Sequence, residues 1–154
     1  MLSIRKGVKE DLPGVLALVK ELAIYEKAPN EVTNTLEMME EDGFGKQPVF
    51  EFYVAENIGK IIGIALYYYS YSTWKGKCIH LDDIVIKEDQ RRKGIGKLLF
   101  DKVVEVAKEE NVKRLTWVVL EWNKPAIEFY KTYNPVFDSE WINCKFTEEQ
   151  LRAL

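Results

Sequence analysis

The hydrophobic residues of this chain recur with two periods, one typical of helices and one typical of strands. Between residues 12 and 23 they recur every three to four positions, which predicts an amphipathic helix capped by Asp11 and ended before Pro29. A similar period predicts a longer helix over residues 95–110. Shorter helices are predicted over residues 35–41 and 125–133, and after the capping box that begins at Thr147.

Apolar or alternating runs predict strands between these helices. A hairpin is expected to turn at residues 57–60, where an asparagine and a glycine favour a tight turn. The predicted strands cover residues 3–6, 49–56, 61–71, 77–86, 114–120 and 141–146. The order β-α-α-β-β-β-α-β-α-β predicts a three-layer α/β/α domain of the α+β class, with one mixed central sheet and helices on both faces.

Length and composition favour a single domain over residues 1–154. Of these residues, 47% are hydrophobic, enough to bury a continuous core without disulfides or metals. The net charge of −3 and the isoelectric point near 5.4 argue against general nucleic-acid binding. The longest nearly apolar run, 61–69, is half of what a membrane span needs, and no signal peptide is recognisable. We therefore expect a cytoplasmic protein without membrane contact.

The cysteines and the single histidine indicate neither a metal site nor a hydrolase site. Cys78 and Cys144 lack the spacing of zinc ligands and form no disulfide framework, so we expect both to be buried. His80 lacks the companions of a zinc site or a catalytic triad, and we expect it to be structural. No metal is expected.

A basic glycine turn follows the predicted strand 77–86 and opens the longest predicted helix. From Lys87 to Lys97 the chain carries five basic and two acidic residues, so this stretch has a net charge of +3. Helix starts offer free N–H groups to phosphate, and Gly94 and Gly96 let the backbone approach it closely. The turn lacks the Gly-Lys-Ser/Thr ending of a nucleotide P-loop and the third glycine of a dinucleotide fingerprint. The pattern predicts a diphosphate site of another kind.

Asp82 and Asp83 are adjacent inside an apolar strand. In a regular strand one carboxylate would point to each face of the sheet. Carboxylates in such a strand are costly unless they have a partner or a chemical role, and the simplest partner is a lysine or arginine on a covering helix.

The spacing Arg91-x-x-Gly94-x-Gly96 resembles the pyrophosphate turn of the GNAT family of N-acetyltransferases. Further segments resemble the spermidine/spermine (diamine) and thialysine acetyltransferase branch, at residues 21–27, 41–45, 67–77 and 121–125. The resemblance implies the GNAT fold, a homodimer, and acetyl-CoA as cosubstrate. It implies transfer of the acetyl group to a primary amine of a polyamine or diamine, by direct attack in a ternary complex. Thialysine or another amine-bearing amino acid is the alternative acceptor, and a non-catalytic acyl-CoA-binding module is the alternative to an enzyme.

The resemblance also implies which residues bind the coenzyme. The main chain around Ile84 would pair with the pantetheine arm, where a bulge splays two parallel strands, and the Ile84 N–H would polarise the thioester carbonyl. Asn123 is in addition a natural cap of the helix that Pro125 opens. The implied coenzyme-binding residues are Ile84, Val85, Ile86, Arg91, Arg92, Lys93, Gly94, Ile95, Gly96, Lys97, Asn123, Lys124, Pro125, Ala126 and Tyr130.

Two residues are implied to be catalytic, Asp82 and Tyr130. A primary amine with a pKa near ~10.4 is almost wholly protonated at neutral pH, and only its neutral form attacks a thioester, so a base is needed. Enzymes of this branch hold a glutamate at the position of Asp82. The shorter Asp82 would act through a bridging water or mainly bind the ammonium, and the Tyr130 phenol would protonate the departing thiolate.

An acidic slot is implied for the acceptor amine. Tyr25 and Glu26 match positions that hold the distal amine, and residues 116–118 match a strand beside the substrate. The aromatic residues between Tyr67 and Trp74 are expected to form sheet core and one wall of the slot. The implied substrate-binding residues are Tyr25, Glu26, Asp82, Asp83, Thr116, Trp117, Val118 and Glu140.

Overall fold

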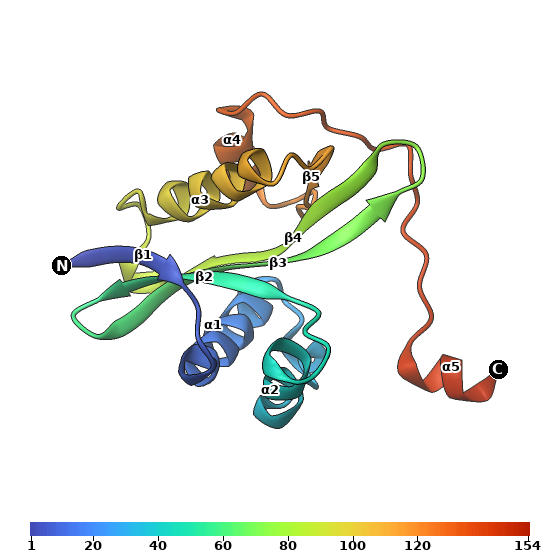
Figure 1. The fold of residues 1–154 in the computed structure, drawn as a ribbon, viewed down its shortest axis with the longest axis horizontal. Coiled ribbons are helices and arrows are strands. Elements are labelled where there is room, and N and C mark those ends of the chain that lie inside the picture. Colours follow the sequence, from blue (N-terminus) through green and yellow to red (C-terminus); the bar gives the residue numbers. More distant parts are fainter. The chain divides into compact units, whose positions relative to one another are not determined.

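A five-stranded mixed sheet lies at the centre of the first part of the chain (Figure 1). The computed structural model describes all of residues 1–154, which fall into two units, Met1–Val118 and Val119–Leu154. In the first unit the strand order is β1-β2-β3-β4-β5, with β5 parallel to β4 and every other pair antiparallel. The strands are β1 (Leu2–Lys6), β2 (Glu51–Asn57), β3 (Lys60–Ser72), β4 (Gly76–Ile86) and β5 (Arg114–Thr116). The prediction of one domain over residues 1–154 stays a prediction.

Helices cover both faces of this sheet. Two helices, α1 (Leu12–Tyr25) and α2 (Leu36–Phe44), lie on one face, and α3 (Ile95–Glu109) lies on the other (Figure 1). Short 3-10 turns precede α1, α2 and α3, at Lys9–Asp11, Pro29–Glu31 and Glu88–Gln90. The predicted three-layer arrangement with a mixed central sheet is confirmed.

The alternation of side chains along β2 and β3 divides the core between the two faces. Phe52 and Ile64 belong to a buried cluster with Leu12 and Val15 of α1. Tyr53, on the opposite face, has its ring 6.3 Å from that of Tyr67. The two strands meet in the predicted hairpin, where both turn residues have positive φ angles, as a type I′ turn requires.

Asp11 precedes α1, but it does not cap the helix as predicted. Its carboxylate accepts hydrogen bonds from both terminal nitrogens of Arg5, at 2.8 and 3.0 Å, and from the Val8 N–H at 2.9 Å. Arg5 also donates to Glu56 on β2. Asp11 is only 8% exposed. A buried carboxylate is stabilised more by an ion pair, here with Arg5 of β1, than by capping a helix.

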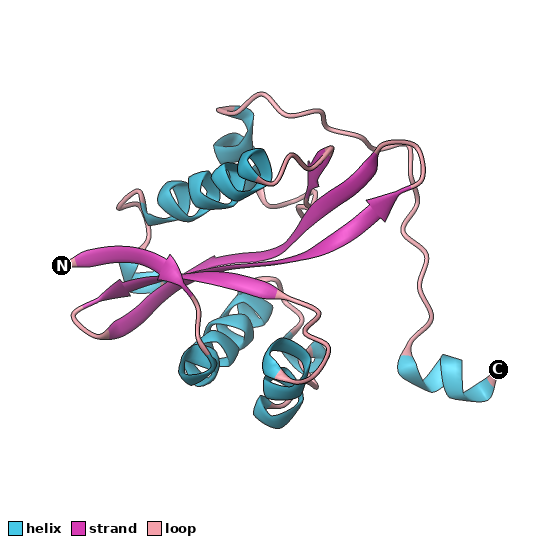
Figure 2. Ribbon diagram, viewed as in Figure 1, coloured by secondary structure: helices cyan, strands magenta, loops and turns pink.

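The strand prediction over residues 114–120 is too long, and that over 141–146 is wrong. Only Arg114–Thr116 pairs with β4, and the next residues leave the sheet. Residues between α4 (Lys124–Lys131) and α5 (Glu148–Ala153) form a loop (Figure 2). A strand needs a neighbouring edge to pair with, and the second unit contains only these two helices.

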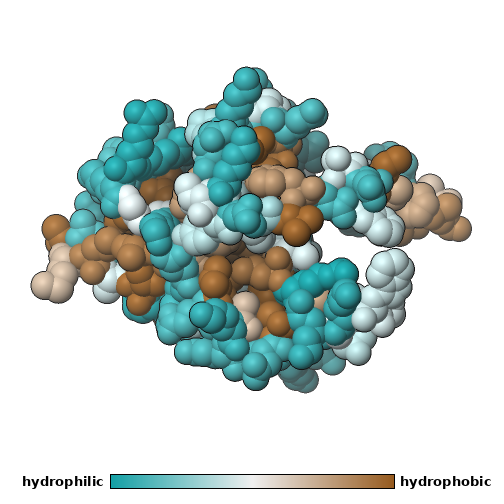
Figure 3. Space-filling view, turned by 90° about the horizontal axis from the view of Figure 1, so that it is seen from above, coloured by the Kyte–Doolittle hydropathy of each residue, from teal (hydrophilic) through white to brown (hydrophobic).

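The second unit also exposes much of its apolar surface. Cys144 is exposed, contrary to prediction, whereas Cys78 is buried in β4 as expected. Hydrophobic residues show between hydrophilic ones on the face seen in Figure 3. The large apolar residues exposed in this unit include Val136, Phe137, Trp141, Ile142, Phe146, Leu151 and Leu154.

The capping box of α5, between Thr147 and Gln150, is confirmed. No helix in the structure is long and apolar enough to cross a membrane.

We predict that Asp11→Ala lowers the free energy of unfolding by about 2 kcal/mol at pH 7, because it leaves the Arg5 guanidinium without its buried acceptor. Arg5 holds the pKa of Asp11 below its usual 3.8, so this contribution is present above that pH and is lost in stronger acid. Urea unfolding measures both effects. Glu56→Gln is the control at the more exposed partner and should cost about 0.5 kcal/mol or less. Equal losses in the two variants would contradict the assignment.

Candidate active site

A β-bulge at Asp82 brings both adjacent carboxylates to one side of the sheet. In the pairing of β3 with β4, Leu66 lies opposite Asp83 and Tyr67 lies opposite Leu81, so Asp82 is an extra residue without an opposite partner. The prediction that the two aspartates face opposite sides is therefore wrong. A regular strand would have separated them, and the extra residue cancels that alternation.

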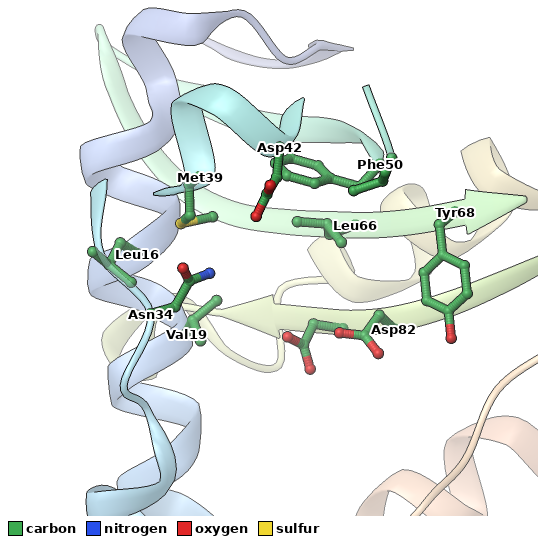
Figure 4. A pocket seen from close by; sticks show the side chains of 11 residues that line it. Leu16, Val19, Asn34, Met39, Asp42, Phe50, Leu66, Tyr68 and Asp82 are labelled. Atoms are coloured by element: carbon green, nitrogen blue, oxygen red, sulfur yellow. The ribbon is translucent and has the colours of Figure 1, made fainter. Parts of the chain in front are cut away.

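Both aspartates line a cavity of about 430 Å³ between the sheet and the helices α1 and α2 (Figure 4). Asp82 and Tyr68 stand beside each other on neighbouring strands, while Leu16 and Val19 form the wall from α1 (Figure 4). Apolar and polar side chains both line the cavity, and three of the polar ones are carboxylates. Its lining residues are Leu16, Val19, Asn34, Met39, Asp42, Val49, Phe50, Leu66, Tyr68, Asp82 and Asp83.

Asn34 and Asp42 were not among the predicted site residues. Asp42 lies within the segment 41–45 that resembles the GNAT branch, so that resemblance was the available signal. Asn34 lies in the connection before α2 and carries no motif. Tyr68 belongs to the aromatic run that was expected to form a wall of the amine site, and here it lines the cavity.

Negative charge accumulates at this cavity. Burial, together with the smaller effect of the neighbouring charges of Asp82 and Glu26, raises the pKa of Asp83 to about 7. Burial also raises the pKa of Glu26. A cationic ligand would relieve this repulsion, and a carboxyl group with a pKa near 7 can accept a proton at neutral pH. The site therefore suits an ammonium group that must lose a proton.

The edge of β4 that faces β5 becomes unpaired just beyond its contact with that strand. The parallel pairing covers only residues 78–80 of β4, where the Nδ1 atom of His80 is 2.8 Å from the Thr116 hydroxyl. Farther along, Lys87 donates its N–H to Ile62 of β3, so alternation turns the main-chain groups of Ile84 and Ile86 away from β3. These groups lie where β5 no longer pairs, as expected for a splayed strand pair.

The basic glycine turn connects this open edge to the start of α3. Gly94 has a left-handed conformation, with φ of 79°, at the cap position of α3, and Arg92 is also left-handed. A Cβ atom added at Gly96 would meet only Ile86, at 3.7 Å, so packing within the protein does not require a glycine there. Lys97 forms an ion pair with Asp101 at 2.6 Å. The turn leaves room above the helix start, as a bound phosphate group needs.

The structure brings only some of the predicted acceptor residues to the cavity. Glu26 acts on Asp83 through its charge, and Tyr25 lies under the guanidinium of Arg91 at 5.1 Å from the ring centroid. Trp117 instead packs edge-on against Phe100 of α3, with the ring centroids 5.2 Å apart. Val118 is exposed.

The remaining predicted residues belong to the second unit. The Asn123 side chain accepts a hydrogen bond from the Ala126 N–H at 3.4 Å, so it caps α4 as expected. Tyr130 on this helix is 6% exposed, and burial raises its pKa to about 12. The phenol is therefore protonated at neutral pH, which is the form that a proton donor needs. Glu140 is exposed, and its role stays a prediction.

Known proteins with similar sequences agree on one family. A sequence profile described as "Acetyltransferase (GNAT) family" matches residues 17–134. Thialysine N-epsilon-acetyltransferase of Bos taurus is 38% identical, over 98% of this chain and 95% of that protein. Spermidine/spermine N(1)-acetyltransferase-like protein 1 of Homo sapiens is 30% identical over 96% of this chain, which corresponds to 23% of that protein.

Solved structures agree on the fold. An integron cassette protein from the mobile metagenome of V. cholerae matches with a TM-score of 0.80 and 20% identity, over 99% of this chain and 96% of that one. An aminoglycoside acetyltransferase from an uncultured soil sample matches with a TM-score of 0.77 and 20% identity, over 95% of each chain.

We predict that Asp83→Asn makes the protein more stable than the wild type by about 4 kcal/mol at pH 8. The native state holds the Asp83 proton up to about pH 7, whereas the unfolded chain releases it near pH 3.8, so wild-type stability falls as the pH rises between these values. The variant lacks this fall. Urea unfolding at pH 4, 6 and 8 measures it.

Asp42→Asn serves as the control for this prediction, because it removes an exposed carboxylate from the same cavity. It should leave the pH dependence of unfolding unchanged. An Asp83→Asn variant whose stability follows the wild-type pH curve would show that Asp83 is ionised in the native protein at neutral pH.

Proposed function

Because this chain belongs to the acetyltransferase (GNAT) family, we propose that it transfers the acetyl group of acetyl-CoA to a primary amine of a polyamine or diamine. The amine attacks directly while both substrates are bound. The observation that carries this proposal lies on one strand, β4, which has an acidic cavity at its Asp82–Asp83 bulge and an open edge leading to the basic turn. Donor and acceptor sites can therefore meet on this strand.

In the proposed donor site the basic turn holds the diphosphate of the coenzyme. Arg91 and the N–H groups at the start of α3 supply charge and hydrogen bonds, and Gly96 leaves room for the phosphate. The pantetheine arm pairs with the main chain of residues 84–86. The Ile84 N–H donates to the thioester oxygen, and one such donor is typically worth about 10²- to 10³-fold in rate. Resemblance to the family supports Asn123, Lys124, Pro125 and Ala126 as further residues that bind the coenzyme.

In the proposed acceptor site the carboxylates bind the ammonium and remove a proton from it. Asp82 is the first candidate for the base, and the pKa near 7 makes Asp83 a second. The neutral nitrogen attacks the thioester carbon, the carbon–sulfur bond breaks, and the amide forms. The coenzyme leaves as a thiolate and takes a proton from Tyr130, which regains one from water. The two protons that the nitrogen loses pass through the carboxylates to water, so one proton is released in each turnover.

The charges of the cavity favour an acceptor without its own carboxylate. The eleven residues that line the cavity include three aspartates and no lysine or arginine. An amino acid such as thialysine would place a carboxylate among these aspartates and be repelled. The similarity to thialysine acetyltransferases nevertheless keeps thialysine as the second candidate.

We also propose that the protein is a cytoplasmic homodimer. The exposed apolar side chains of the last unit support an interface with a second copy, because water contact of so much apolar surface is unfavourable. The two free cysteines, one of them exposed, are typical of a reducing compartment.

We predict that spermidine, spermine and putrescine are acetylated with kcat/KM at least tenfold above that of thialysine, about 1.4 kcal/mol of transition-state discrimination. Initial rates of coenzyme A thiol release measure this, with free lysine as a further comparison. Higher kcat/KM for thialysine would make the amino acid the acceptor. A protein that binds acetyl-CoA in calorimetry but acetylates no amine would be a binding module instead.

We predict that Tyr130→Phe lowers kcat by about 10²-fold or more, because the phenol no longer donates a proton to the thiolate. The ring stays, so the Kd of acetyl-CoA should change by less than about threefold. Steady-state kinetics and calorimetry measure the two quantities separately. Tyr133→Phe, two residues beyond the end of α4, is the matched control and should retain wild-type kcat. Unchanged kcat in Tyr130→Phe would rule out this proton donor.

A further inference from the structure

One face of α1 contacts residues 88–91, the loop that leads into the basic turn. Glu21 and Tyr25 are four positions apart on α1, so their side chains lie on the same face of the helix, near its C-terminal end. The Glu21 carboxylate accepts a hydrogen bond from the Glu88 N–H at 2.9 Å. One turn later, the guanidinium of Arg91 lies over the Tyr25 ring, 5.1 Å from its centroid.

These two contacts provide a hydrogen-bond acceptor and a packing partner that the loop's own side chains do not provide. The 3-10 turn Glu88–Gln90 is preceded by Lys87, which provides no side-chain cap, so the first N–H of the turn depends on Glu21. Arg91 has two partners, since its Nε–H donates to the Ile86 carbonyl at 3.2 Å and its guanidinium lies over the Tyr25 ring. Neither contact uses an Nη–H group, and a guanidinium has four of these for an anion.

We propose that Glu21 and Tyr25 are positioning residues for the coenzyme, which hold residues 88–91 and the Arg91 guanidinium in the form that binds the diphosphate. This inference rests on the proposed function. Tyr25 thereby acts on the donor side, although resemblance to the family places it at the acceptor. The next residue, Glu26, raises the pKa of Asp83 through its charge, so the end of this helix affects the proposed acceptor site as well.

The role of Glu21 depends on its accepting oxygen and not on its charge. Glu21, Lys87, Glu88 and Asp89 line one open cavity, where three carboxylates face a single lysine. A further negative charge close to a diphosphate weakens binding, so electrostatics alone gives no reason for a glutamate at this position. A glutamine keeps the accepting oxygen without the charge, which separates the two explanations.

The test compares Glu21→Ala and Tyr25→Leu with the conservative variants Glu21→Gln and Tyr25→Phe. Calorimetry in the absence of amine measures the Kd of acetyl-CoA, a quantity that an acceptor-site role of Tyr25 would not change. We expect Glu21→Ala and Tyr25→Leu each to raise this Kd by about five- to tenfold. Glu21→Gln and Tyr25→Phe should stay within about twofold of the wild type, since they keep the oxygen and the ring.

Kinetics and a surface control complete the design. In Glu21→Ala the KM for acetyl-CoA should rise while kcat at saturation stays within about twofold, because the reacting groups are untouched. Lys20→Ala, at an exposed position of the same helix, should bind acetyl-CoA like the wild type. Wild-type Kd values in both Glu21→Ala and Tyr25→Leu would overturn this inference alone. A wild-type protein that binds no acetyl-CoA would overturn the proposed function and this inference with it.

Discussion

A strand with one more residue than its neighbour must set two consecutive side chains opposite a single partner position, and β4 does this at Asp82. The extra residue shifts the alternation of side chains and main-chain groups in the part of the strand that follows it. Asp82 and Asp83 come to line the same cavity, and Ile84 and Ile86 turn their main-chain groups toward the edge that β5 leaves unpaired. One local irregularity thus relates an acidic cavity to an open strand edge.

Adjacent carboxylates in a partly buried site repel each other, and the fold tolerates this without a basic partner among the residues that line the cavity. Elsewhere in the same unit a buried carboxylate has a basic partner, as Asp11 has in Arg5. The contrast between Asp11 and Asp83 separates a structural ion pair from a site that a cationic ligand would complete.

The helix α1 contributes to this arrangement at three levels. Its apolar face packs against the sheet through Leu12 and Val15, and Leu16 and Val19 form a cavity wall. Its last two turns contact the loop before α3 through Glu21 and Tyr25. Because one helix contacts both regions, it fixes the position of the basic turn relative to the acidic cavity, and neither region depends on a loop alone.

The sequence by itself determined what depends on nearby residues: the long helix 95–110, the hairpin at 57–60, the glycine turn between Arg91 and Gly96, and the Asn123 cap. Tertiary structure decided the rest. Asp11 bonds to Arg5 instead of capping a helix, because an ion pair between distant residues cannot be read from local spacing. The bulge at Asp82 exists only in the pairing with β3, and residues 141–146 form no strand because they lack a paired edge. Register and pairing are properties of two segments together, which is why no single segment's pattern contains them.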